Sequence, residues 1–93
     1  MAENNFKTFS TLDLYTAAFL TLNNLEVKLE WNNGKVVFTF PVANELYRLL
    51  EQYNSNKNIP VADFVTAIKA LRGRMLSMRN GNERGNVYGN YNR

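Results

Sequence analysis

The sequence contains no cysteine and no histidine, and together these absences exclude most of the familiar catalytic and metal-binding chemistry. Without cysteine there is no disulfide and no thiolate ligand for a metal. Without histidine there is no Ser–His or Cys–His nucleophile pair and no side chain that ordinarily carries protons near neutral pH. No GxxxxGK[ST] or GxGxxG phosphate-binding loop occurs either. We therefore expect a protein that is not an enzyme and that uses no metal or cofactor.

The sequence also lacks a long apolar run. No stretch approaches the roughly 18–20 apolar residues that span a bilayer, and Met1–Lys7 has no apolar centre of the kind found in export signals. A length of 93 residues with 45% hydrophobic content suits a single domain with a modest core. We expect a soluble protein of the cytoplasm with no membrane contact. If a phage encodes it, this is the host cytoplasm.

A first helix is predicted to begin at Ser10, because Ser10 can accept a hydrogen bond as the N-cap and Asp13 follows three residues later. Apolar residues then recur at helical spacing on two sides. They are Leu12, Tyr15, Ala18, Phe19 and Leu22 on one side, and Leu14, Ala17 and Leu20 on the other. The pattern predicts a helix buried on two faces. It ends at Asn23-Asn24, because asparagine tolerates the left-handed conformation.

Residues 25–40 are predicted to form a β-hairpin around Asn33-Gly34, the pair that favours a two-residue type I′ turn. In the register that this turn fixes, Asn32 opposes Lys35. The same register pairs Trp31 with Val36, Leu29 with Phe38 and Val27 with Phe40, all on one apolar face. The opposite face carries Glu26, Lys28, Glu30 and Thr39, with Val37 as its apolar exception. We interpret the close acids Glu26 and Glu30 as part of a solvated face rather than as a catalytic pair.

Two further helices are predicted after the hairpin. Pro41 suits the first turn of the second helix, whose apolar stripe is Val42, Leu46, Leu49, Leu50 and Tyr53. A polar loop at residues 54–58 precedes a third helix that starts at Ile59-Pro60, with Asp63 in its first turn, where a carboxylate complements the helix dipole. The predicted buried face of the third helix consists of Val61, Phe64, Val65, Ile68, Leu71, Met75 and Leu76.

These elements predict an α+β fold in which a helix, a β-hairpin and two helices surround one small core. The domain is expected to span residues 10–79, with an N-terminal arm at 1–9 and a flexible basic tail at 80–93. The tail has a single aliphatic residue, Val87, too little apolar surface to order itself. A two-stranded ribbon exposes two backbone edges, which either the helices or a second copy of the chain must protect. A homodimer is one of the arrangements left open.

Positive charge is concentrated toward the C-terminal end. Residues 69–93 hold six cations and the single acid Glu83, a net charge of +5, whereas residues 1–68 hold five cations and seven acids, a net charge of −2. The candidate nucleic-acid-binding residues are Lys69, Arg72, Arg74, Arg79, Arg84, Tyr88, Tyr91 and Arg93. Their cations suit phosphates, and the two tyrosines suit stacking on unpaired bases. The cations also fit a structural role, since a helix dipole favours positive charge at its C-terminal end.

Several segments together resemble a known family. They are Thr11–Leu20 with its Asp-Leu-x-x-Ala-Ala-x-Leu pattern, Val37–Phe40, Leu46 with Leu49-Leu50, Tyr53-Asn54, Ala62–Phe64 and Leu71. Over about residues 7–79 the chain resembles a small domain family of unknown function found in short open reading frames of bacteria, archaea and their viruses. The resemblance implies the architecture and a phage or mobile-element setting, and it brings no activity or catalytic residue. The Asn-Asn-Leu connection before the hairpin and the Asn/Gly/Tyr tail depart from the family pattern.

The leading functional prediction is a small accessory or regulatory protein of a phage or mobile element that binds DNA or RNA through the basic end of the third helix and the tail. No helix-turn-helix, zinc finger or RNP aromatic motif accompanies the charge, and a net charge of +3 is modest for such a protein. A second prediction is a protein-interaction module, such as a phage-encoded inhibitor of a host nucleic-acid enzyme or defence complex. A third is a homo-oligomeric structural protein.

Overall fold

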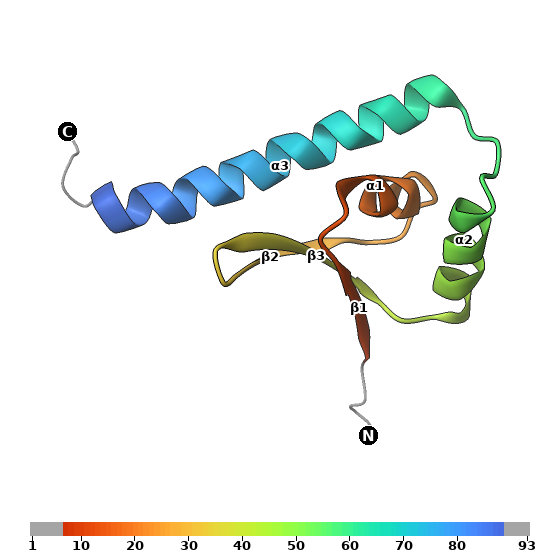
Figure 1. Cartoon of the computed structure of the whole chain (residues 1–93), viewed down its shortest axis with the longest axis horizontal. Helices are drawn as coiled ribbons and strands as arrows, with labels where there is room; N and C mark the ends of the chain where they lie inside the picture. The colour runs from red at the N-terminus through yellow and green to blue at the C-terminus, as the bar shows by residue number, and fades with distance from the viewer. Residues whose placement is uncertain (1–6, 89–93) are drawn as a thin grey trace.

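The computed structural model describes the backbone of residues 7–88 and the side chains of residues 7–82. Over these residues the chain forms a three-stranded antiparallel sheet and three helices, an α+β fold (Figure 1). The elements are β1 (Thr8–Thr11), α1 (Leu14–Leu22), β2 (Lys28–Asn32), β3 (Lys35–Pro41), α2 (Asn44–Asn54) and α3 (Val61–Tyr88). The predicted order of helix, hairpin, helix and helix is confirmed, with one additional strand before it.

Helix α1 lies at the centre of the molecule. Four consecutive residues, Ala17–Leu20, are buried, so the middle turn of the helix is enclosed on every side, in agreement with the two-sided apolar pattern of the sequence. Figure 1 views α1 end-on, with α3 crossing on one side, α2 on another and the sheet below. The molecule measures 48 × 41 × 17 Å, and the nine residues of α1 extend about 14 Å, so this short helix spans most of the thinnest dimension.

The start of α1 differs from the prediction. Ser10 is not a helix cap but a residue of β1, where its hydroxyl lies 3.2 Å from the hydroxyl of Thr39. The N-cap is Asp13, whose carboxylate accepts a hydrogen bond from the backbone N–H of Tyr15 at 3.1 Å. Thr11 in turn accepts from the N–H of Asp13 at 3.0 Å. Ser10 and Asp13 are both good capping residues, and the sequence pattern selected the wrong one.

The sheet has the strand order β1-β3-β2, so the predicted two-stranded ribbon is wrong and β3 is paired on both edges. The predicted register is confirmed for Asn32 with Lys35, Trp31 with Val36, and Leu29 with Phe38. Val27 precedes β2, and Phe40 instead pairs with Phe9 of β1. Because β1 covers this edge, Thr39 is only 7% exposed, although the sequence placed it on a solvated face.

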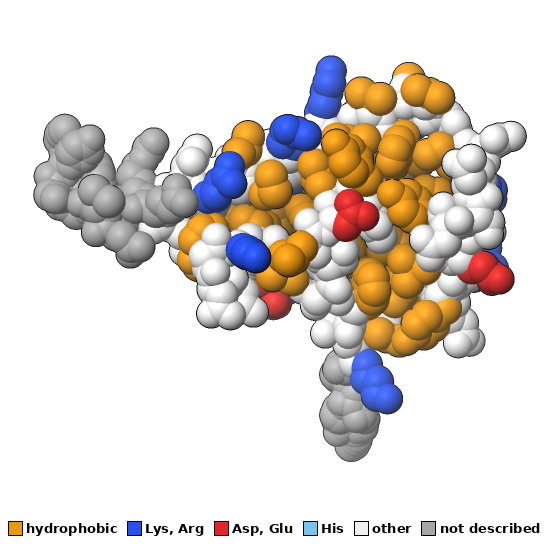
Figure 2. Space-filling view, in the orientation of Figure 1, with side chains coloured by type: hydrophobic (Ala, Val, Ile, Leu, Met, Phe, Trp, Pro, Cys, Tyr) orange, Lys and Arg blue, Asp and Glu red, His pale blue; other side chains and the backbone are white. Residues whose placement is uncertain are grey.

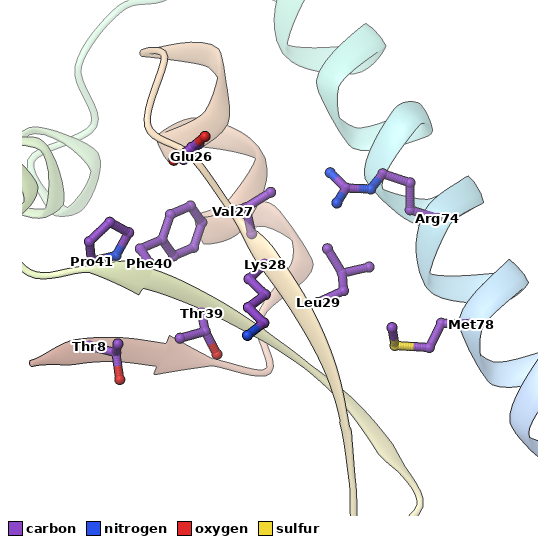
Figure 3. A pocket seen from close by; sticks show the side chains of 10 residues that line it. All are labelled: Thr8, Glu26, Val27, Lys28, Leu29, Thr39, Phe40, Pro41, Arg74 and Met78. Carbon is purple, nitrogen blue, oxygen red and sulfur yellow. The ribbon is translucent and has the colours of Figure 1, made fainter. Parts of the chain in front are cut away.

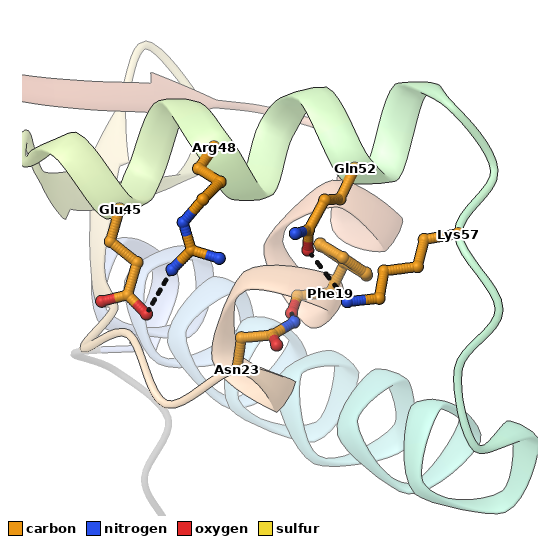
Figure 4. Close-up of polar contacts among 6 residues, drawn as sticks. All are labelled: Phe19, Asn23, Glu45, Arg48, Gln52 and Lys57. Atoms are coloured by element: carbon orange, nitrogen blue, oxygen red, sulfur yellow. Dashed lines mark hydrogen bonds and ion pairs between the residues drawn. The ribbon is translucent and has the colours of Figure 1, made fainter.

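Asparagine provides left-handed backbone positions at three chain reversals: Asn24, Asn33 and Asn56. Asn33 and Gly34 have φ values of 54° and 78°, as a type I′ turn requires. Asn24 (φ 69°) follows α1, and Leu25 N–H donates to the Leu20 carbonyl at 3.1 Å, which makes a Schellman ending. Figure 4 shows the side-chain amide of Asn23 on the Phe19 carbonyl, at 2.9 Å. The predicted end of α1 at Asn23-Asn24 is confirmed.

Helix α2 begins later than predicted. Pro41 is the last residue of β3, paired with Thr8, and does not lie in the first turn of the helix. The N–H of Val42 donates to the Lys7 carbonyl at 3.0 Å, and α2 begins at Asn44. A proline at the end of a strand removes no needed ladder bond, so both positions suit its chemistry. Within α2, the expected stripe positions Leu46 and Leu49 are buried.

Helix α3 begins directly after Ile59-Pro60 with Asp63 in its first turn, as predicted. It runs to Tyr88, so the segment from Asn80 to Tyr88 is helical where the sequence predicted a flexible tail; residues 89–93 lie outside the described residues. No proline interrupts this segment, and glycines weaken a helix without stopping it. The side-chain amide of Asn82 donates to the Met78 carbonyl at 2.9 Å.

The buried face of α3 is narrower than predicted. Leu71 is buried, while Phe64, Ile68 and Met75 are half-buried against the core. The other three residues of the predicted face are exposed: Val61, Val65 and Leu76. They point away from α1 because one side of a helix, about a third of its circumference, is enough to cover a single neighbouring layer.

We predict very different losses of stability for two leucines that the sequence assigned to the same helix. Leu20→Ala removes a fully buried side chain (0% exposed) and should lower the free energy of unfolding by about 2–5 kcal/mol. Leu12→Ala removes a side chain that is 57% exposed and should change it by less than about 0.5 kcal/mol. Urea unfolding followed by circular dichroism measures both. Equal losses would contradict the placement of α1.

Two glycines provide a second matched test. Gly34→Ala forces a side chain onto a residue with φ +78° and should destabilise the protein by about 1 kcal/mol or more. Gly73 lies inside α3 with open space around its Cα, so Gly73→Ala should stabilise by about 0.5–1 kcal/mol. Thermal unfolding midpoints should therefore move in opposite directions. A loss of stability in Gly73→Ala would argue against a continuous α3.

Candidate nucleic-acid interface

The four predicted cations that α3 carries within the described side chains do not share one surface. All four are exposed. Relative to the buried stripe of Leu71, Lys69, Arg72 and Arg79 lie on one side of the helix. Arg74 lies on the other side, about 160° around the helix axis from Arg72. The structure thus brings three of these residues together and separates the fourth.

A lysine from the hairpin joins the three. A hollow of about 210 Å³ lies between the hairpin turn and α3, and its lining includes Lys35 and Arg79 together with the apolar Leu12, Val36 and Met75. Sequence reasoning missed Lys35, because only the packing of the hairpin beneath α3 places it there. We call the set Lys35, Lys69, Arg72 and Arg79 the cationic flank. In Figure 2, basic side chains follow α3 and lie beside the hairpin turn on one face.

The cationic flank takes part in no ion pair among the described side chains. No acid occurs in α3 between Asp63 and Glu83. Among the described side chains the ion pairs are Lys28 with Glu30 at 3.8 Å and Arg48 with Glu45 at 3.5 Å, the latter drawn in Figure 4. Neither involves α3. From Lys69 to Arg79 the helix rises about 15 Å, which matches about four phosphates of one strand along a duplex axis.

The remaining predicted residues are placed only in part. Arg84 and Tyr88 belong to α3, whose backbone continues the line of the cationic flank. Their side chains, together with Tyr91 and Arg93, lie outside the described part of the structure. The proposed stacking of tyrosines on bases is therefore still a prediction.

Arg74 faces a different hollow. This hollow has a volume of about 590 Å³ and lies between α3, the start of β2 and the ends of β1 and β3. Figure 3 shows Arg74 and Met78 on α3 across a gap from Val27 and Leu29. Apolar side chains thus form both walls near Arg74, which gives this cation an environment unlike that of the cationic flank.

Large apolar side chains are also exposed, some of them beside the cationic flank. They are Leu12, Tyr15, Tyr47, Val61, Val65 and Leu76. Figure 2 shows a broad apolar area on one face, between the N-terminal half of α3 and α2. Basic side chains border this area along α3, so one face combines apolar surface with positive charge.

The described residues show neither a metal-binding cluster nor a membrane-spanning helix. They contain no cluster of three or more Asp, Glu, His or Cys side chains able to hold a metal ion. None of the helices in this part combines the length and apolar character needed to cross a bilayer.

In a comparison with protein-family models, residues 4–77 match the family described as Domain of unknown function (DUF5659). The chain belongs to this family. The DUF5659 match covers the whole sheet, α1, α2 and α3 as far as Ser77, and it confirms the resemblance found in the sequence. Neither a search of curated proteins nor a search of solved structures gives a match.

Membership of the DUF5659 family supplies no activity, so function is inferred from the surface of this chain. The family match ends at Ser77, which includes Lys35, Lys69, Arg72 and Arg74 and leaves Arg79 and the residues after it outside. The cationic flank thus combines residues inside the family domain with one residue beyond it.

The proximity of Lys35 and Arg79 can be tested by charge reversal. Lys35→Glu should stabilise the protein by about 0.2–1 kcal/mol at low salt, because it places a carboxylate beside Arg79. The gain should shrink as salt rises. Lys35→Gln is the control, and urea unfolding is the measurement. If the gain persists unchanged when Arg79 is replaced by Gln, the two residues are not neighbours.

Proposed function

We propose that this protein binds nucleic acid through the cationic flank, as a non-enzymatic accessory protein of a phage or mobile element. The observation that carries the proposal is the convergence of Lys35, from the hairpin, with Lys69, Arg72 and Arg79 on one exposed side of α3. Exposed cations from separate elements, on a helix with no acid between Asp63 and Glu83, form the kind of surface that neutralises a phosphate backbone.

The proposed binding mode relies on phosphate contacts. The cationic flank extends about 15 Å along α3, and a helix that lies along one nucleic-acid strand can neutralise successive phosphates without reading bases. Arg84 and Arg93 would extend these contacts, and Tyr88 and Tyr91 would stack on unpaired bases. Stacking favours single-stranded DNA or RNA over duplex, because paired bases hide their faces.

We predict salt-sensitive binding of labelled single-stranded DNA, RNA and duplex DNA, measured by fluorescence anisotropy. On single strands each phosphate contact should contribute about 0.7 to the slope of log affinity against log salt. The triple variant Lys69→Gln, Arg72→Gln, Arg79→Gln should therefore lose about two units of slope. Its affinity at low salt should fall by about tenfold or more.

The matched control removes the same charge from other surfaces. Lys28→Gln, Arg48→Gln, Lys57→Gln changes three exposed cations that lie outside the cationic flank. This variant should keep most of the slope. Equal losses in both variants would mean that net charge, rather than the flank, drives binding. Absence of binding at low salt would discard nucleic-acid binding altogether.

A second candidate function is a protein-interaction module, such as an inhibitor that docks on a host nucleic-acid enzyme or defence complex. The exposed apolar side chains favour it, among them Tyr15, 48% exposed, and Val61, 73% exposed. Contiguous apolar surface is typical of interaction sites. Tagged protein should then retain a host protein after nuclease treatment, whereas a nucleic-acid binder should lose its companions. A homo-oligomeric structural protein, the third candidate, would show a multiple of the chain mass in solution.

A further inference from the structure

Strand β2 presents an unpaired backbone edge. It is the outermost strand beside β3 in the order β1-β3-β2. In a hairpin with a two-residue turn, the residues that flank the turn are hydrogen-bonded to each other, and the bonding then alternates along the strand. Asn32, Glu30 and Lys28 therefore bond to β3. The N–H and C=O groups of Leu29 and Trp31 point the other way, and no backbone partner for them occurs within the described residues.

The hollow beside this edge is lined by Val27 and Leu29 on the strand side and by Arg74 and Met78 of α3 on the helix side (Figure 3). The rest of its lining consists of Glu26, Lys28 and four residues at the ends of β1 and β3: Thr8, Thr39, Phe40 and Pro41. Its volume of about 590 Å³ lies within the range of ligand-binding clefts. A groove between an edge strand and a helix is a recurring site for an extended peptide, which bonds to the strand and places alternate side chains against the helix.

The spacing of the two helix residues matches an extended chain. Met78 and Arg74 are four residues apart on one side of α3, which places them about 6 Å apart along the helix axis. Side chains i and i+2 of a strand share a face and lie about 6.6 Å apart. One face of an added strand could therefore contact Met78 with one side chain and Arg74 with the next.

We propose that the groove between β2 and α3 binds an extended segment of a partner protein as a fourth strand of the sheet. The segment carries an apolar side chain against Met78 and Leu29 and, two positions away on the same face, an acidic side chain that pairs with Arg74. Charge complementarity selects the acid, because Arg74 is the cation on the helix wall and, together with Lys28, outnumbers the one acid of the lining, Glu26. This site lies on the opposite side of α3 from the cationic flank and does not depend on nucleic-acid binding.

A second copy of the chain is a poorer occupant. The side chains of β2 that share the face toward α3 are Leu29 and Trp31, both apolar, followed outside the strand by Val27. Within β2 the one acid, Glu30, belongs to the opposite face. A copy that continued the sheet through its own β2 would therefore offer Arg74 no carboxylate from within that strand.

The test uses arrays of six-residue peptides of otherwise mixed sequence, each with Val or Leu at position 2 and either Glu or Lys at position 4. The full-length protein should be retained about tenfold more by the Glu set than by the Lys set. Arg74→Glu should reverse this preference. Arg72→Glu makes the same charge change on the opposite flank and should leave the preference intact, while it weakens nucleic-acid binding.

Backbone pairing is tested by hydrogen exchange. Addition of a retained Glu-set peptide should slow exchange of the Leu29 and Trp31 amides. The proposal is overturned if neither set is retained, if the two sets are retained equally, or if Arg74→Glu changes nothing while circular dichroism shows the variant folded. It is also overturned if the two amides are protected without peptide in proportion to protein concentration, since a second copy then occupies the edge.

Discussion

The burial of Ala17–Leu20 in α1 is the constraint on which the rest of the fold depends. A nine-residue helix is too short to be stable alone, so α1 exists only because α2, α3 and the sheet surround it. Two alanines allow close approach of its neighbours, and Phe19 packs against Tyr53 of α2 with ring centroids 5.3 Å apart. Asp13 and Asn24 satisfy the polar groups at its two ends. Helices α2 and α3 and strand β1 contact this helix directly, and α3 in turn packs on β2 and β3.

Sequence patterns predicted the structure well where a residue determines its own backbone geometry. Asn33-Gly34 fixed the hairpin and its register, and Asn23-Asn24 fixed the end of α1, because left-handed positions admit few residue types. The strand β1 was missed for the opposite reason. Four residues of mixed polarity form a strand only because the edge of β3 is present to receive them, and that edge is a tertiary feature.

The residue types of the candidate site could be predicted from the sequence, but their arrangement in space could not. The excess of positive charge near α3 follows from counting residues, but its division into two surfaces follows from the angle at which α3 contacts α1 and the sheet. Leu71 faces the core, which places Arg72 and Arg74 on opposite sides. Lys35 belongs to the flank because the hairpin turn lies beneath α3, a contact between elements far apart in the sequence.

The separation of the two surfaces also bears on how partners could share the protein. An occupant of the groove beside β2 would not cover the cationic flank, so a protein segment and a nucleic acid would not compete for the same atoms. Helix α3 holds both surfaces on one continuous rod with a fixed angular relation. The positions of both surfaces therefore depend on the number of residues within the helix. A single residue inserted between Leu71 and Arg74 would rotate every later residue by about 100° around the helix axis. Met75 and Met78 would leave the core, and each later cation would move to a different side. Residues can be added at the end of such a helix without moving the two surfaces, whereas an insertion or deletion within the helix moves them.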